Sequence, residues 1–334
     1  MVERCVAVPL AVGLAAVPGR TSLESVGLFP GRATVKTVTQ RNLDKEENSN
    51  MRRKLLAGLL ACVMLFGLLP ATALAEGETA VAKINETTYE TLDEAVRAAA
   101  DGAIIELLVD AETEAGFGIK GQTLTVHGNH HKITFTGKTI YLAKDGNVPA
   151  ILNFENCVID MTQTVGTPAI AGESYPWSAI VLNWDCQLNL KNSELKMDGS
   201  SYKGNTACYM HSGAGMTLTD STMTAENYAG NGFSTDDGNY DVGVTLDNSS
   251  MTLNKNRTGF NSNYVVTAKN QSYLTVTNSR GHGSNGADYF IDDSTVFYDG
   301  NGSHGMSARN VILTNGADVT SSHNTLRRLR QRQR

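Results

Sequence analysis

The chain has 334 residues, of which 41% are hydrophobic and 19% are charged, and its formal net charge is −6. Nine of the 28 Lys and Arg and five of the 34 Asp and Glu fall before residue 76, and five Arg fall after residue 324. Residues 76–324 therefore carry a net charge of about −15, which argues against nucleic acid and against anionic polysaccharides as partners.

The first 75 residues contain a pattern typical of a secretion signal. From Met51, a basic segment is followed by an apolar run and by an Ala-Leu-Ala cleavage site that ends at Ala75. The run is too short to span a membrane comfortably and Pro70 interrupts it, so we expect cleavage near Ala75 and no membrane span in the mature chain. The alternative is a lipoprotein signal at Cys62. Residues 1–50 show no period, and we interpret them as an upstream extension of a chain that starts at Met51.

Residues 76–110 are predicted to form a strand and a capping helix. Thr91 and Glu94 have the spacing of a capping box. An apolar stripe follows, and Gly102 is the expected end of the helix. The members of the stripe are Leu92, Ala95, Val96 and Ala99. A β-solenoid needs its open end covered, because that end would otherwise expose apolar side chains and unpaired backbone groups.

A six-residue phrase recurs through residues 111–324, in which two apolar residues alternate with polar ones before an Asn or Asp and a small residue. Its clearest copies are LNLKNS (188–193), MTLTDS (216–221), VTLDNS (244–249) and LTVTNS (274–279). Successive Asn or Asp positions lie 28 to 30 residues apart. A fixed period of this length predicts a solenoid, and the alternation within each copy predicts that its unit is built from strands.

The expected fold is an all-β solenoid, a right-handed parallel β-helix with three faces and an N-terminal capping helix. The Asn and Asp of each phrase are expected at the corners, because these residues tolerate left-handed backbone angles. Asn side chains stacked coil on coil can also hydrogen-bond in a ladder. A second periodic mark is provided by glycines at 204, 232, 259 and 286. Cys157, Cys186 and Cys208 show no spacing typical of disulfides or zinc, so we expect them in the core.

The pairing of YETLDEAVRAAADG (89–102) with these coils resembles the pectate-lyase-like β-helix proteins secreted or displayed by Gram-positive gut bacteria. The resemblance covers about residues 81–324. It implies a fold more than an activity, because that superfamily contains polysaccharide lyases, glycoside hydrolases and adhesins without catalysis.

Candidate catalytic residues are Asp236, Asp237, Arg280 and His282. Polygalacturonases resemble this set in carrying carboxylates and a Gly-His-Gly motif on neighbouring coils for acid–base hydrolysis. Here the motifs are merged or widely spaced. In a lyase, Arg280 would instead act as the base. We therefore regard an enzyme as the alternative interpretation and expect an enzyme to bring the four side chains together in a cleft.

Two further sets of binding residues can be proposed. Asp237, Asn239 and Asp241 have the alternate spacing of calcium ligands, so Ca²⁺ is the one cofactor that the sequence suggests. The spacing between phrases widens to 36 residues between Asn156 and Asn192. The added segment carries the sugar-stacking candidates Tyr175 and Trp177, and Trp184 is expected in the strand that follows.

The last residues, TLRRLRQRQR (325–334), break the repeat and form a basic tail that we do not expect to belong to the native solenoid. Taken together, the sequence predicts a monomeric secreted or cell-surface module, adhesin-like or glycan-contacting and without catalysis. Its expected partners are an extracellular glycan or a host surface protein. The alternatives are a polysaccharide lyase or glycoside hydrolase, and a structural spacer within a longer surface protein.

Overall fold

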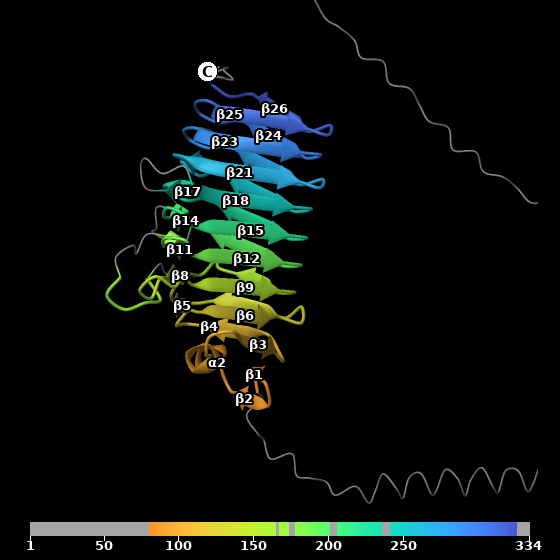
Figure 1. Cartoon of the computed structure of the whole chain (residues 1–334). Coiled ribbons are helices and arrows are strands. Elements are labelled where there is room, and N and C mark those ends of the chain that lie inside the picture. The colour runs from red at the N-terminus through yellow and green to blue at the C-terminus, as the bar shows by residue number, and fades with distance from the viewer. Residues whose placement is uncertain (1–79, 165–166, 174–177, 201–205, 236–240, 326–334) are drawn as a thin grey trace, which may run out of the picture. The chain divides into compact units, whose positions relative to one another are not determined.

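The computed structural model describes residues 80–164, 167–173, 178–200, 206–235 and 241–325. They lie within the compact unit Glu76–Arg334 and form a parallel β-solenoid of about eight turns (Figure 1). The predicted all-β solenoid is confirmed. The right hand of its coil stays an expectation, supported by the strong preference of parallel crossovers for that hand.

Each turn consists of up to three strands, and strands of successive turns pair in parallel register. The strands of the first face are β5 (Phe117–Lys120), β8 (Ile140–Ala143), β11 (Ser178–Leu182), β14 (Thr206–Met210), β17 (Asn231–Thr235) and β20 (Thr258–Asn261). Those of the second face are β3 (Ala103–Leu107), β6 (Thr123–His127), β9 (Ile151–Glu155), β12 (Gln187–Lys191), β15 (Gly215–Thr219), β18 (Val242–Asp247), β21 (Tyr264–Lys269), β23 (Ser284–Asp292) and β25 (Met306–Thr314). The start of β23 also pairs with β20, so this strand continues both faces.

The third face is a separate sheet of nine strands within the described residues. Its members are β4 (Ala111–Thr113), β7 (Lys132–Phe135), β10 (Val158–Asp160), β13 (Glu194–Asp198), β16 (Thr222–Glu226), β19 (Ser250–Asn254), β22 (Tyr273–Thr277), β24 (Thr295–Asp299) and β26 (Asp318–Ser322). The predicted three-faced coil is therefore confirmed over this part of the chain.

The N-terminal end is closed by a short hairpin and one helix. Strands β1 (Ala82–Ile84) and β2 (Thr87–Tyr89) pair antiparallel, and β1 also pairs antiparallel with β3. Helix α2 (Leu92–Ala98) lies at this end (Figure 1). The Thr91 side chain accepts a hydrogen bond from the Glu94 amide at 3.2 Å, as a capping box requires. The helix ends at Ala98, before the expected Gly102, whose φ of 75° belongs to the turn into β3.

The core is formed by the alternate side chains that point into the coil. Phe233 and Phe260 occupy equivalent positions on successive turns, and their rings stack with centroids 5.1 Å apart. Tyr264 meets both rings edge-on. The three described cysteines, Cys157, Cys186 and Cys208, are buried and free, as predicted. Burial raises the pKa of the Cys157 thiol to about 12.

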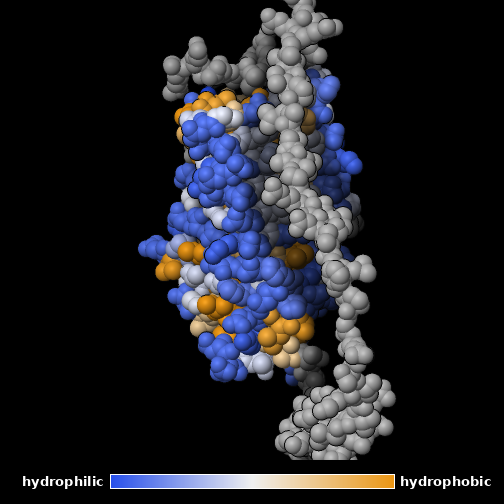
Figure 2. Space-filling model, turned by 90° about the vertical axis from the view of Figure 1, so that its right-hand side faces the viewer, coloured by the Kyte–Doolittle hydropathy of each residue, from blue (hydrophilic) through white to orange (hydrophobic). Residues whose placement is uncertain are grey.

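The corner after the second face is formed by the Asn and Asp of the repeated phrase. All five, from Asn156 to Asn278, have positive φ between 48° and 55°, as expected for residues that tolerate the left-handed region. The Asn192 amide donates to the Asn156 side-chain oxygen at 3.1 Å, and the Asn248 amide donates to Asp220 at 2.6 Å. The predicted amide ladder therefore exists, with aspartate among its rungs. Figure 2 shows this side of the solenoid, where a hydrophilic column runs along the axis.

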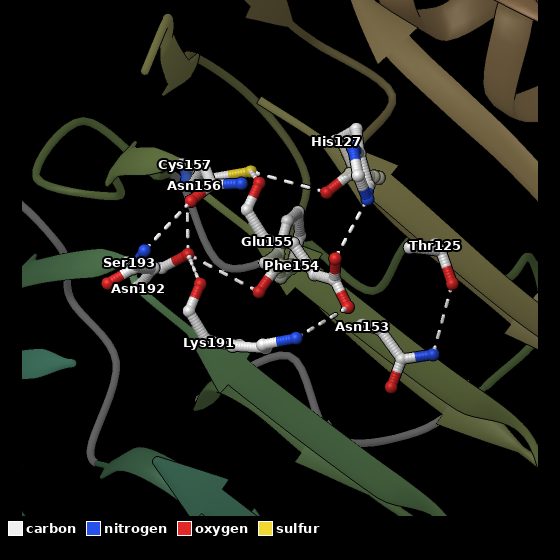
Figure 3. A network of polar contacts seen from close by, with 11 residues as sticks. Thr125, His127, Asn153, Phe154, Glu155, Asn156, Cys157, Lys191, Asn192 and Ser193 are labelled. Carbon is white, nitrogen blue, oxygen red and sulfur yellow. Dashed lines mark hydrogen bonds and ion pairs between the residues drawn. The ribbon is translucent and has the colours of Figure 1, made fainter. Parts of the chain in front are cut away.

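The serine that follows each corner residue forms a second ladder, inside the coil. The amide of each serine donates to the hydroxyl of the next at 3.0 Å, from Ser193 through Ser221, Ser249 and Ser272 to Ser294. Each hydroxyl donates to a carbonyl of its own turn. Cys157 begins the row by donating its amide to Ser193 (Figure 3). The small residue of the phrase is therefore specified by polar satisfaction as well as by size.

The glycines of the first face form a row in register with one another. Gly232 is level with Gly259 and Gly259 with Gly283, because Phe233 pairs with Phe260 and Phe260 with Ser284. Gly286, the fourth glycine of the predicted period, lies instead in the β-bulge of β23 with a φ of 88°. The bulge accounts for the shift, because it adds a residue to one strand of the pair.

Candidate functional site

The outer side of the first face is partly covered by the segment inserted between β10 and β11. Tyr141, Ala143 and Val181 point outward from β8 and β11 and are buried at 5% exposure or less. Ala169 and Ile170 of the inserted segment pack against them. The expected widening of the repeat thus forms a covering over this face. Its aromatic candidates Tyr175 and Trp177 lie outside the described residues.

Trp184 lies beside this covering and is half exposed, with 50% of its surface accessible. β11 ends at Leu182, so Trp184 is in the turn between the first and second faces and not in the strand where the sequence predicted it. Its indole stacks on the His211 ring of the next turn, with centroids 4.5 Å apart and planes 29° apart. Tyr209 meets the same imidazole edge-on at 5.2 Å. We call these three side chains the Trp184 platform.

The support beneath the platform is rigid and polar. His211 is only 1% exposed, so the face of Trp184 that it contacts is closed to solvent and the accessible half of the indole is the other side. Asn183 donates to the Tyr141 hydroxyl at 3.2 Å, and that hydroxyl donates to Glu173 at 3.0 Å. The Asn183 side-chain oxygen is buried and accepts no hydrogen bond from the described residues. A ligand seated here would meet an aromatic surface flanked by acceptor oxygens.

Charged groups lie at the same corner. Lys144 forms an ion pair with Asp185, the neighbour of Trp184. On the next turn, Asp241 accepts a hydrogen bond from the Ser212 hydroxyl at 2.6 Å, which holds the pKa of its carboxyl below the usual value. Asp241 is the described member of the predicted calcium set, since Asp237 and Asn239 lie outside the described residues. No group of three or more His, Cys, Asp or Glu gathers to hold a metal ion in the described part of the chain.

Arg280 and His282, the described half of the predicted catalytic set, lie at the corner that leads into the first face. The Arg280 guanidinium donates to the carbonyls of Tyr228 at 3.1 Å and Ala229 at 2.7 Å, two turns back. His282 faces His304 of the following turn, and their Nδ1 atoms are 3.3 Å apart. Both contacts link turns to one another.

Asp236 and Asp237 follow Thr235, the last residue of β17, and lie outside the described residues. The corner of Arg280 and His282 leads into the starts of the first-face strands, because the Gly259 amide at the start of β20 donates to the His282 carbonyl at 3.1 Å. The two halves of the predicted set thus belong to opposite ends of these strands in the chain path. Whether the carboxylates approach Arg280 stays untested.

The hydrophilic corner carries a shallow depression of about 500 Å³. Its lining consists of Thr219, Asp220, Asp247, Asn248, Asn270, Gln271 and Asp293. Asp247 accepts a hydrogen bond from Asn270 at 2.6 Å and forms an ion pair with Lys269 at 3.0 Å. These side chains already satisfy one another, so the depression is better explained as part of the ladder than as a ligand site.

Sequence reasoning identifies Trp184 but not its supporting residues. From sequence, His211 is one more histidine at a corner, and nothing distinguishes Tyr209 or Tyr141 from other tyrosines. The signal available is the register: Leu182 pairs with Met210, so Asn183 and His211 occupy the same position on successive turns. That register depends on the length of the intervening loops, which a period of variable length does not fix.

Comparisons with known proteins leave the fold as the defined class. The chain matches no family model, and neither the curated proteins nor the solved structures contain a match. The protein is therefore a parallel β-solenoid with an aromatic platform at one corner. Within the described residues, no helix is long and apolar enough to span a membrane.

Proposed function

We propose that the protein is a secreted or cell-surface β-solenoid of the pectate-lyase-like kind that contacts extracellular glycans without catalysis. The observation that carries this proposal is the Trp184 platform: a half-exposed indole held against a buried imidazole on a rigid coil. A fixed aromatic surface binds the apolar face of a sugar ring at low entropic cost, since the side chain is already ordered before binding.

The polar groups around the platform fit a neutral or cationic glycan better than an anionic one. Glu173 and Asp185 lie beside it, and the Asn183 oxygen is an acceptor available to a sugar hydroxyl. The net charge of about −15 over residues 76–324 acts in the same direction, because a uronic acid polymer would be repelled. Arg280, the base that a lyase would need, is engaged by two backbone carbonyls.

The test is retention of the full chain on a panel of immobilised neutral, amino and acidic polysaccharides. We expect retention on a neutral or amino glycan and at least a tenfold loss of affinity for Trp184→Ala. Tyr273→Ala is the matched control, because Tyr273 is 56% exposed but lies on the third face. Equal retention of the wild type and Trp184→Ala would contradict the assignment of the platform.

The same panel separates binding from catalysis. New reducing ends, or the absorbance of unsaturated products, would overturn the non-catalytic proposal and direct mutagenesis to Asp236, Asp237, Arg280 and His282. Loss of retention in Tyr273→Ala, with Trp184→Ala unaffected, would move the binding surface to the third face.

A further inference from the structure

The two histidines that precede the last turns present their ring edges to one another. The Nδ1 atoms of His282 and His304 are 3.3 Å apart, while the ring centroids are 5.3 Å apart and the planes differ by 8°. Parallel rings whose nitrogens are much closer than their centres must lie nearly edge to edge. The two Nδ1 atoms therefore face one another across the boundary between successive turns.

We propose that His282 and His304 form a two-histidine site for a divalent transition-metal ion of the Zn²⁺ type. Zinc lies 2.0–2.1 Å from a histidine nitrogen, so an ion equidistant from two nitrogens 3.3 Å apart subtends an angle of about 107°. That angle is close to tetrahedral. The pair supplies two ligands and leaves two positions for water or for a donor from a partner.

The backbone around the pair holds this geometry before any ion binds. The Gly283 amide donates to the His304 carbonyl at 2.9 Å, and the Ser303 amide donates to the Gly281 carbonyl at 2.9 Å. A Cβ at Gly283 would lie 2.2 Å from the Gly305 carbonyl oxygen, which shows how closely the two turns approach. The imidazoles are carried on a fixed corner, so little ordering is needed on binding.

The electrostatic surroundings suit a cation ligand. Burial, and then the neighbouring His304, lower the pKa of His282, so its imidazole is neutral at neutral pH and can coordinate. Arg280 reaches back to Tyr228 and Ala229, on the side away from His304. Without metal, one Nδ1 donates its proton to the other; coordination requires that proton to move to Nε2, and no net charge is released.

The test is titration of the full chain with Zn²⁺ by calorimetry. We expect one ion per chain, and at least a tenfold weaker affinity for both His282→Asn and His304→Asn. His323→Asn is the matched control, because its side chain is 83% exposed near the same end of the solenoid, where it pairs with Asp299. An affinity that none of the three variants changes would show adventitious binding elsewhere and overturn the proposal.

A second measurement uses the unmodified protein, so that a variant that fails to fold cannot obscure the answer. Zn²⁺ should protect His282 and His304 from carbethoxylation by diethylpyrocarbonate, as read by peptide mass spectrometry, while His323 stays reactive. Equal modification with and without Zn²⁺ would overturn the site. The result is independent of glycan retention, and Trp184→Ala should bind Zn²⁺ like the wild type.

Discussion

The backbone amide of Ser193 donates to the hydroxyl of Ser221, one turn further along, at 3.0 Å. Ser221 repeats the same bond to Ser249, and its own hydroxyl donates to the Thr219 carbonyl at 2.7 Å. Each serine therefore links two turns through one oxygen that both accepts and donates. Because these atoms are buried, the ladder satisfies backbone groups that no strand can reach at a corner.

Removing one rung should destabilise the solenoid. Ser221→Ala leaves the Ser193 amide without an acceptor in a buried corner, at a cost of about 1–3 kcal/mol. We expect a lower midpoint in urea unfolding followed by circular dichroism. The control is Ser250→Ala on β19, which lies outside the ladder and is only half-buried. Equal midpoints for the two variants would show that the ladder does not contribute to stability.

The architecture could be predicted from the sequence because a solenoid repeats its chemistry. The phrase that ends in Asn192-Ser193 encodes two inward apolar residues, a left-handed corner and a ladder rung, and its period encodes the stacking. The Trp184 platform could not be predicted in the same way. It joins Trp184 to a histidine 27 positions later, and that contact depends on how side chains lean between turns.

The site candidates illustrate the same limit. Arg280 and His282 match a catalytic motif as a short string, but a corner of a Gly- and Asn-rich coil provides such strings for structural reasons. The structure uses both residues to connect turns. The facing of His282 and His304 escapes the periodic pattern because the turn shortens to 22 residues here, away from the main period.

The corner at Asn192 separates two contributions to stability. Its φ is 52°, and its amide donates to Asn156. Asn192→Ala removes the hydrogen bond and keeps an unfavourable backbone angle, so we expect a loss of about 1–2 kcal/mol. Asn192→Gly removes the same hydrogen bond but relieves the angle and should lose less. Thermal unfolding of the two variants measures the difference; a glycine variant less stable than the alanine variant would contradict the backbone explanation.

Glycine is required at position 283 but not at position 243. A Cβ at Gly283 would lie 2.2 Å from the Gly305 carbonyl oxygen and 2.4 Å from the Tyr298 ring. Gly283→Ala should therefore cost about 1–3 kcal/mol or more, since neither backbone nor a buried ring can move easily. A Cβ at Gly243 would meet no heavy atom within 4 Å, so Gly243→Ala is the matched control.

These two variants can be compared in one denaturation series. We expect Gly243→Ala to unfold at or above the wild-type midpoint, because alanine reduces the freedom of the unfolded chain. Gly283→Ala should unfold well below it. A wild-type midpoint for Gly283→Ala would show that the last turns separate at little cost, which would also weaken the fixed geometry required by the His282–His304 site.

Asp247 makes the stability of the corner depend on pH. The Asn270 amide, followed by Lys269, lowers the pKa of its carboxyl below the usual value. A carboxyl whose pKa is lower in the folded state stabilises that state above the unfolded pKa of about 3.9, and this contribution is lost as pH falls through the folded pKa. The wild-type melting temperature should therefore fall on acidification from pH 5 to pH 2.

Asp247→Asn tests how much of this fall belongs to the corner. The variant has no carboxyl to protonate there, so its melting temperature should depend less steeply on pH below about 4 than that of the wild type. Glu112→Gln on β4 removes one charge from the exposed surface of the third face and controls for net charge. Because Asp247 lies at an exposed corner, solvent screening keeps the effect small, and the comparison is best made at low salt. Parallel pH profiles for the wild type and Asp247→Asn would show that the Asn270 and Lys269 contacts do not persist in solution.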